Sequence, residues 1–492
     1  MGSMKSKSSA FFERSIPLAV MLLFGVLYIA LSRSKALLLD EFIMLLTAKR
    51  PFLEGLLQTQ DYSAPLYQLL LRVFAPQPHP SELVLRLPSA IAGVLCLFAS
   101  WSLVKRYVNG FLAFIFLILL GLNPFFMQWA TMARPYTLYG LLFVLCLYFS
   151  CATIRSYSDN KVLFFIGSSV LLCYATYIGI PVVCLFVATT ALLIPERPNT
   201  SRFLKFNILT VIGLVPVLFL LSRYLLEGVP ALHGDWIVRP DWLDFLVAMR
   251  FAQYFGDLYA GAIFFTFFVL GLTFYIHNET IYQRASAKDG AAYFIVKNFC
   301  EQRVIWLYIS LFVFSLFFVI NAISFVFPIY VARYGFPVLI LLLFCFCMLI
   351  ENFPRVTQYA LLCIVLTLTL SHLDATFQST RNTIILAGLK TRELAAAGLP
   401  VHLLNWKHGT DWRSPEAFGL QYYGFDVRNF RFIDLDYGNA HTKVKDDGFL
   451  KENPHGAILV YGYMRDVIAD FFGKRHVPFK REGLADYTIF LY

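Results

Sequence analysis

The stretch LDEFIMLLTAKRPFLEGLLQTQDYSAPLYQLLLR, residues 39–72, decides how this chain is interpreted. It follows the first long apolar run and opens with two adjacent acids, Asp40 and Glu41. A third acid, Asp61, stands just ahead of a Ser-Ala-Pro-Leu-Tyr turn. Acids at the mouth of an apolar helix are costly in a membrane unless they have a function. The alternatives are interfacial side chains that face water or, for Asp61, a plain turn residue.

The composition indicates a polytopic membrane protein. Of 492 residues, 58% are hydrophobic and 15% are charged, whereas a soluble chain carries roughly 25% charged residues. The net charge is +10, yet residues 374–492 hold 15 Lys and Arg against 14 Asp and Glu, so the excess lies in the apolar part. Basic loops beside anionic lipid headgroups explain this excess better than nucleic-acid binding does.

About eleven apolar runs are candidate membrane spans, which need roughly 20 residues each. Residues 1–373 therefore form a predicted transmembrane domain, with a first external loop at 32–83. A turn or a kink is open within 162–195, where Gly179 and Pro181 interrupt the run. The candidates are 15–31, 84–104, 110–123, 136–154, 162–177, 178–195, 206–226, 258–277, 304–327, 335–350 and 356–373.

The basic connectors predict the orientation. The start of the chain is basic and no small-residue cleavage site follows it, so we expect an uncleaved first span with a cytoplasmic N-terminus. Short basic loops then alternate correctly with the spans. An odd number of spans places the first loop and the C-terminus together on the extracytoplasmic face. The connectors expected inside contain Lys105, Arg106, Arg155, Lys161, Arg197, Arg202, Lys205 and Arg355, with the loop 278–303.

Two further regions are expected to be folded outside the spans. In the first loop, apolar residues from 38 to 46 predict a helix on the membrane surface that ends at Pro51, and a second helix follows Pro65. From residue 374 the hydropathy falls, and 374–492 is expected to be a small extracytoplasmic α/β domain. Its expected strands are 401–405, 457–461 and 488–492, and its expected helices are 383–397 and 465–472.

The metal-ligating residue types give no strong signal. The nine cysteines lie in or beside apolar runs or in inside loops, without zinc-ligand spacing, and the histidines are scattered. Acids without His or Cys companions suit Mg²⁺ or Mn²⁺ better than zinc, so Asp40 and Asp61 are the ligands if a metal is used. A carboxylate base also works without any metal, so the cofactor stays open.

Several motifs resemble the GT-C superfamily of polytopic glycosyltransferases. Asp-Glu after the first span, then D-x-S-x-P-L-Y, then RLPSAIAG from Arg86, is similar to the first external loop of the family-39-like enzymes. These include protein O-mannosyltransferases and aminoarabinose transferases. NPFFMQWATMARPYTL from Asn123 resembles a second family segment, in which Met132 stands where the family has Glu. PIYVARYGFP from Pro328 resembles a third.

The resemblance implies a role for each residue. Asp40 would be the catalytic base, with Glu41 as its supporting neighbour and Asp61 as the acid that orients the acceptor. Arg134 and Arg333 would bind the donor phosphate, because a phosphate leaving group needs cations rather than a general acid. The alternative for both arginines is a cation at the membrane flank. Supporting positions are Tyr67, Tyr136 and Tyr334, whereas Arg86 is interpreted as a structural anchor.

The predicted function is an inverting glycosyltransferase of a bacterial-type inner membrane. It would move a sugar from a polyprenyl-phosphate donor to an unidentified lipid, glycan or protein acceptor. One alternative is a transporter or flippase of a lipid-linked substrate, although the sequence lacks the internal repeats that many transporters show. The other alternative is a non-catalytic relative that has kept the fold.

Overall fold

The computed structural model describes most of the helical part and the strands at the C-terminus. The described residues are 2–53, 65–226 and 335–371, apart from 78 and 352; scattered positions between 305 and 322; 383–405; short segments between 420 and 461; and 465–492 apart from 485 and 486. The predicted loops 227–257 and 278–303 lie outside them.

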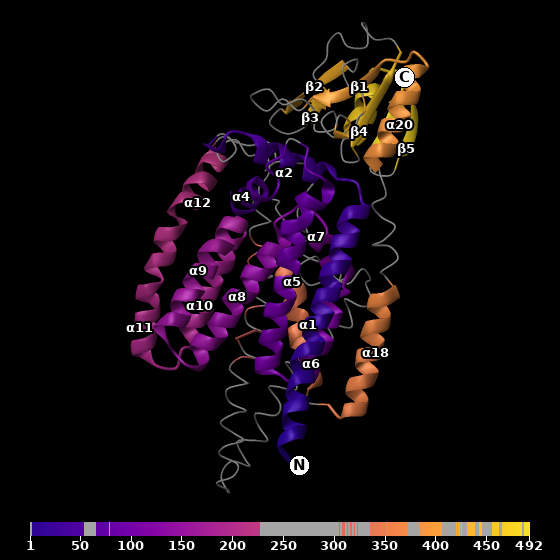
Figure 1. Ribbon diagram of the computed structural model, residues 1–492. Coiled ribbons are helices and arrows are strands. Elements are labelled where there is room, and N and C mark those ends of the chain that lie inside the picture. Colours follow the sequence, from indigo (N-terminus) through magenta and orange to yellow (C-terminus); the bar gives the residue numbers. More distant parts are fainter. Residues whose placement is uncertain are drawn as a thin grey trace.

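Long helices run side by side through the first part of the chain (Figure 1). Within it, α5 packs against α1, α6 and α8 and forms the centre. The helices are α1 (Gly2–Ser34), α5 (Glu82–Tyr107), α6 (Gly110–Gly121), α7 (Pro124–Ala130), α8 (Tyr136–Arg155), α9 (Asp159–Ala175), α10 (Gly179–Leu193), α11 (Arg197–Phe206), α12 (Ile208–Leu226), α17 (Phe336–Ile350) and α18 (Arg355–Ser371).

Four described stretches are long and apolar enough to cross a membrane, and the bent pair α6–α7 makes a fifth if it is one span. The helical, multi-pass character is therefore confirmed. The number eleven stays a prediction, because the expected spans 258–277 and 304–327 lie wholly or largely outside the described residues. The four stretches are Ser15–Ser34, Glu82–Tyr107, Tyr136–Arg155 and Arg197–Arg223.

Two breaks in the helices follow from local sequence. The axes of α6 and α7 differ by 66°, because Pro124 cannot continue a helix and the Asn123 side chain caps the new one by accepting the Phe126 N–H at 3.1 Å. The open question at 162–195 is answered by a turn, since α9 and α10 are separate helices. At this turn a Cβ on Gly179 would stand 2.7 Å from the Leu172 carbonyl oxygen, so only glycine fits without a shift.

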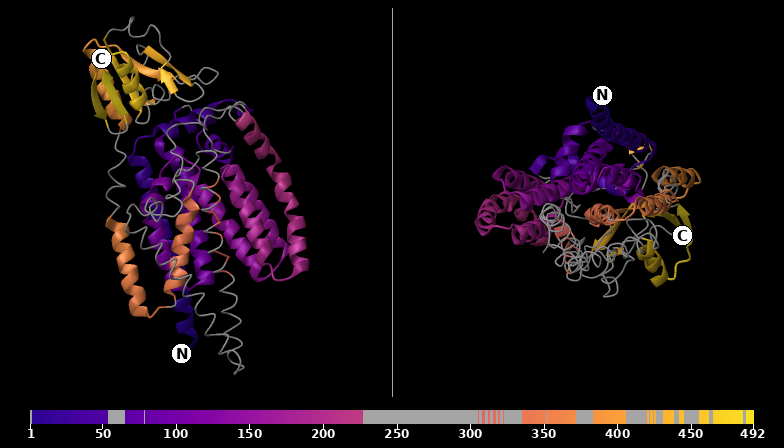
Figure 2. Two further views of the ribbon diagram at one scale, coloured as in Figure 1. Left: turned by 180° about the vertical axis from the view of Figure 1, so that it is seen from behind. Right: turned by 90° about the horizontal axis from the view of Figure 1, so that it is seen from below.

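The two helices expected in the first loop are present. They are α2 (Leu39–Lys49), followed by Pro51, and α4 (Pro65–Phe74). Figure 1 shows α2 lying across one end of the long helices, called the α2 end below. The N-terminus lies at the other end (Figures 1 and 2). Phe42 and Leu45 of α2 and Tyr67 of α4 are fully or almost fully buried, so α2 is anchored by its apolar face.

The C-terminal segment forms a six-stranded sheet in the order β3-β2-β1-β4-β6-β5. β1 pairs in parallel with β2 and β4, and the remaining pairs are antiparallel. Helix α20 (Thr383–Ala396) packs on the sheet, and α23 (Arg465–Lys474) follows β4. The strands are β1 (Val401–Asn405), β2 (Arg431–Tyr437), β3 (Thr442–Val444), β4 (Ala457–Tyr461), β5 (Lys480–Leu484) and β6 (Tyr487–Leu491).

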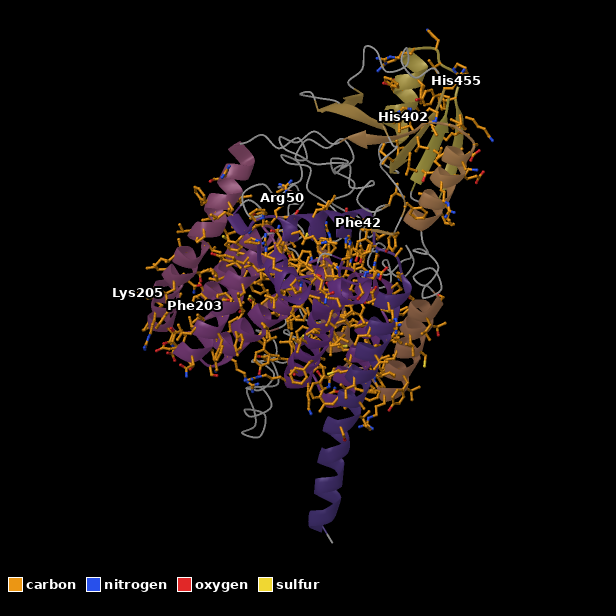
Figure 3. All side chains as sticks on the ribbon, turned by 45° about the horizontal axis from the view of Figure 1, so that its top comes forward. Phe42, Arg50, Phe203, Lys205, His402 and His455 are labelled. Carbon is orange, nitrogen blue, oxygen red and sulfur yellow. The ribbon has the colours of Figure 1, made fainter. Side chains whose placement is uncertain are left out.

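The sheet lies beyond the α2 end (Figures 1 and 2). Figure 3 shows Phe42 on the side of the helices that faces the sheet carrying His402. One apolar cluster joins Phe42 and Leu45 of α2 to Leu403 and Leu459 of the strands. The first loop and the C-terminal sheet therefore share a continuous apolar core.

Candidate functional site

A buried ion pair between Glu41 and Arg86 holds the frame of the candidate site. The Arg86 Nε donates to Glu41 Oε1 at 2.7 Å, and its Nη2 donates to Oε2 at 2.6 Å. Both side chains are almost fully buried, at 0% and 2% exposure. A bidentate arginine–carboxylate pair combines charge attraction with a fixed geometry, so α2 is held against the N-terminal part of α5.

The Glu41 carboxylate accepts two backbone N–H groups as well. Leu38, which precedes α2, donates to Oε2 at 2.9 Å, and Ala133 donates to Oε1 at 2.7 Å. Four donors therefore surround the two oxygens. A carboxylate bound in this way suits a supporting group that orients α2 rather than the base itself, because a base must reach the acceptor proton.

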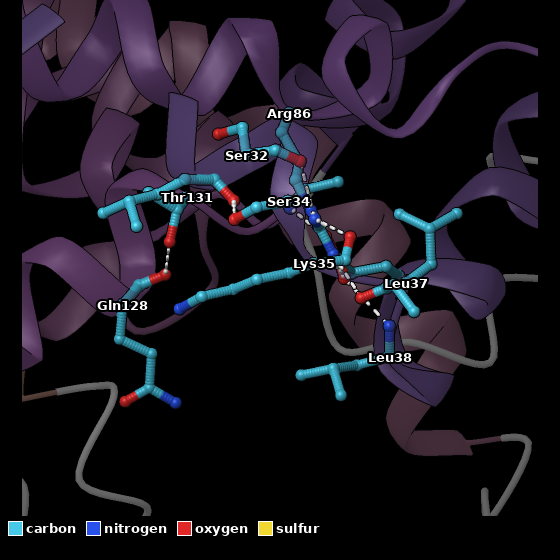
Figure 4. Close-up of polar contacts among 12 residues, drawn as sticks. Ser32, Ser34, Lys35, Leu37, Leu38, Arg86, Gln128 and Thr131 are labelled. Carbon is cyan, nitrogen blue, oxygen red and sulfur yellow. Dashed lines mark hydrogen bonds and ion pairs between the residues drawn. The ribbon is translucent and has the colours of Figure 1, made fainter. Parts of the chain in front are cut away.

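Arg86 uses all five of its N–H groups. Besides Glu41, it donates to the backbone carbonyls of Ser32, Lys35 and Ala36 at 2.6 to 2.9 Å. These carbonyls belong to the end of α1 and the link that follows (Figure 4). Arg86 thus joins the first loop to α1 and α5, which agrees with its interpretation as a structural anchor.

Asp40 points in a different direction from Glu41, as expected for neighbours on a helix. Its Oδ2 lies 3.4 Å from the Nη2 of Arg134, and its backbone oxygen accepts from Nη1 at 3.4 Å. The Asp40 side chain is 38% exposed, whereas the Arg134 side chain is 3% exposed. The structure therefore brings the predicted base and the predicted phosphate-binding cation together, with the carboxylate still accessible.

The two predicted tyrosines of this region support Arg134. The Arg134 guanidinium lies 5.8 Å from the centre of the Tyr136 ring, a favourable cation–π distance. Ser89 Oγ donates to the Arg134 carbonyl oxygen at 2.9 Å, and the Tyr67 hydroxyl lies 2.5 Å from Ser89 Oγ. Since the only hydrogen of Ser89 Oγ goes to Arg134, Tyr67 is the donor in that contact.

Lys35 is a cation that sequence reasoning missed. It follows α1 directly, and its side chain extends toward the side on which Gln128 lies (Figure 4). Burial, and secondly the charge of Arg86, lower the pKa of Lys35. The signal in the sequence was a lysine five residues before Asp40, which resembles an ordinary membrane-flank residue.

Three predicted site residues, Asp61, Arg333 and Tyr334, lie outside the described residues, and their roles stay predictions. Within the described part of the chain, no three His, Cys, Asp or Glu side chains are grouped as metal ligands. The use of Mg²⁺ or Mn²⁺ at Asp40 and Asp61 therefore stays open, because Asp61 lies outside the described residues. Ser89 was missed as well, since a serine inside an apolar run carries no signal of its own.

Known proteins share part of the sequence pattern and the overall fold of this chain. Residues 62–226 match the family model described as dolichyl-phosphate-mannose-protein mannosyltransferase. No curated protein sequence matches the chain. ArnT from Cupriavidus metallidurans bound to undecaprenyl phosphate has a similar structure, with a TM-score of 0.52 and 12% sequence identity over 97% of each chain. The same protein in the apo state gives 0.55 and 12% over 98% of each chain. The resemblance to the GT-C glycosyltransferases is thereby confirmed.

Proposed function

We propose that this chain is a membrane glycosyltransferase that moves a sugar from a polyprenyl-phosphate donor to an acceptor hydroxyl or amine, with inversion. The observation that carries the proposal is the accessible Asp40 carboxylate beside the buried Arg134 guanidinium. The match to a mannosyltransferase family model and the fold of ArnT, which was crystallised with undecaprenyl phosphate, support the donor class.

The chemistry assigns one task to each group. Asp40 accepts the proton of the acceptor as the acceptor attacks the anomeric carbon of the sugar. The bond between that carbon and the phosphate oxygen breaks, and its electron pair stays on the phosphate. Arg134 stabilises the charge that develops there, and we assign Lys35 as a second cation. The buried Glu41–Arg86 pair keeps α2 in place during the reaction.

We infer that the α2 end faces the outside of a cytoplasmic membrane. The opposite helix ends carry Lys105 and Arg106 of α5, Arg155 of α8 and Lys205 of α11. An excess of Lys and Arg marks cytoplasmic ends. The acceptor would then be an extracytoplasmic lipid, glycan or protein, reached after the donor has been delivered to that face.

Donor turnover tests the proposal. Purified protein in detergent is given a panel of radiolabelled polyprenyl-phosphate sugars, and sugar release or transfer is measured. Asp40→Asn should lower turnover by about 10²- to 10⁴-fold, the usual loss on removing a general base. Asp159→Asn, a matched control at an exposed pair with Arg202, should keep the wild-type rate. Donor binding without turnover, unaltered by Asp40→Asn, would instead favour the transporter or flippase.

A further inference from the structure

We propose that the C-terminal segment positions α2 for the reaction through the hydroxyl of Tyr423. The proposal rests on the proposed function, because it assigns Tyr423 as a positioning residue for Asp40. The Leu37 N–H donates to the Tyr423 hydroxyl oxygen at 2.7 Å, although the two residues stand 386 positions apart. The contact joins the last part of the chain to the backbone just before the candidate catalytic helix, two residues ahead of its first residue.

The two residues just before α2 need hydrogen-bond acceptors for their N–H groups. Leu38 is the N-cap residue and Leu37 precedes it, so neither N–H has a partner in the backbone ladder of the helix. At α2, Leu38 donates to Glu41 Oε2 at 2.9 Å, and its neighbour Leu37 donates to Tyr423. Two successive N–H groups are therefore held by one acceptor from α2 itself and one from the C-terminal segment.

The rings around this hydrogen bond are packed against α2. Phe42, which is fully buried, meets the Tyr422 ring edge to face at 5.6 Å and the Tyr423 ring at 6.2 Å. The two tyrosine rings lie 5.1 Å apart. Edge-to-face pairs at such distances fix orientation as well as contact, so Tyr423 is held where its hydroxyl meets Leu37.

The adjacent tyrosine makes a different contact. The Tyr422 hydroxyl donates to the Pro80 carbonyl oxygen, just ahead of α5. Tyr422 and Tyr423 thus share ring packing, but their hydroxyl groups bond to different segments, Pro80 and Leu37. Burial raises the pKa of both hydroxyls, so both are neutral at physiological pH. The pair provides a matched comparison within the chain.

The link from Tyr423 to Asp40 is short. Asp40 lies three residues after Leu37, in the first turn of α2. Both of its contacts with Arg134, through Oδ2 and through the backbone oxygen, are as long as 3.4 Å. A shift at Leu37 changes both together, and a displacement of about 1 Å at a reacting group can cost about 10²-fold in rate.

The test compares Tyr423→Phe with Tyr422→Phe in the full-length protein. Hydrogen exchange is measured on peptides covering 36–48 and 76–84, together with kcat and KM for the donor and the melting temperature. Tyr423→Phe should exchange faster at the start of α2 and lose about tenfold in kcat, with KM within twofold of wild type. Tyr422→Phe should exchange faster near Pro80 and keep most of its kcat.

Three outcomes would overturn the inference. They are unchanged exchange at α2 in Tyr423→Phe, a wild-type kcat despite faster exchange, and a lower melting temperature with kcat retained below melting. The last would assign the bond to stability alone. Absence of turnover in the wild-type protein would reject the proposed function instead, whereas the exchange comparison would still decide whether Tyr423 holds the start of α2.

Discussion

Glu41 and Arg86 satisfy each other's charge in an almost fully buried pair, and every N–H of Arg86 has an acceptor. Loss of either partner would be strongly destabilising, because it leaves an uncompensated charge buried away from water. The two adjacent acids therefore have different roles. Glu41 is buried in the ion pair that holds α2, whereas the Asp40 side chain stays accessible.

Glu41→Gln should destabilise the protein strongly. The substitution leaves the Arg86 charge buried, which typically costs about 3–5 kcal/mol. The matched control is Asp159→Asn, whose pair with Arg202 is exposed and should contribute about 0–1 kcal/mol. Thermal unfolding in detergent measures both. Equal melting temperatures for the two variants would contradict the structural role of Glu41.

Arg134→Gln should lower turnover by about 10²- to 10³-fold, the usual loss when a stabilising donor is removed from a developing charge. Arg134→Lys should recover only part of the activity, because an ammonium lacks the planar guanidinium that reaches both Oδ2 and the backbone oxygen of Asp40. Steady-state kinetics with the radiolabelled donor measures both. The control is Arg202→Gln, on α11 at the end of the helices away from α2. An Arg134→Lys variant as active as wild type would contradict the need for a guanidinium at this position.

Ser89→Ala should cost more stability than Tyr67→Phe. The serine variant leaves both the Arg134 carbonyl and the Tyr67 hydroxyl buried without the partner that Ser89 supplied, at about 1–3 kcal/mol for an unsatisfied group. Tyr67→Phe leaves the bond from Ser89 to Arg134 intact and should cost about 1 kcal/mol. Thermal unfolding of the two variants ranks them, and the reverse order would assign the donors differently.

Donor binding should weaken as the solution becomes alkaline. Burial and Arg86 lower the pKa of Lys35, so its charge is present below that lowered pKa and is lost as the pH rises through it. KM for the donor should therefore rise at a lower pH than for an ordinary lysine. Lys35→Gln should have a high KM for the donor that does not change as the pH rises. Lys35→Arg should keep a low KM at alkaline pH, because arginine stays charged. The control is Lys105→Gln, because Lys105 lies in the last turn of α5, at the end of that helix away from α2. A wild-type profile in Lys35→Gln would exclude this lysine from the donor site.

Turnover should survive removal of divalent ions. Arg134 already lies beside the Asp40 carboxylate, and a divalent cation on the same carboxylate would meet like-charge repulsion. The measurement is sugar transfer after dialysis against EDTA, with potassium chloride added to match the ionic strength. Activity that vanishes in EDTA and returns with Mg²⁺ or Mn²⁺ would instead support a metal held by Asp40 and Asp61.

The sequence predicts the parts of this protein that depend on local pattern. Hydropathy predicts the spans, and Pro51 and Pro65 delimit α2 and α4. The strands expected at 401–405 and 457–461 are confirmed residue for residue. Strand β2 was missed, although its Ile-Asp-Leu-Asp-Tyr run alternates as a half-buried strand does, because the interpretation relied on uninterrupted apolar runs.

The contacts that build the candidate site were not predictable in the same way. Glu41 contacts Arg86, 45 positions away in the sequence, and Ala133, 92 positions away. These contacts depend on how α1, α5 and α7 pack. The angular rule for neighbours on a helix predicts that only one of Asp40 and Glu41 faces the pocket, but not which one. The family resemblance favoured Asp40, and the greater exposure of its side chain agrees.

The hydrogen bond between Leu37 and Tyr423 has a consequence for biosynthesis. Leu37 leaves the ribosome early, whereas Tyr423 is made after every described membrane helix has been synthesised. The hydrogen bond that holds Leu37, just before α2, can therefore form only after residue 423 has been synthesised. A nascent or truncated chain would insert into the bilayer without this last support, so the order of synthesis delays the completed arrangement around Asp40 until the polypeptide is almost whole.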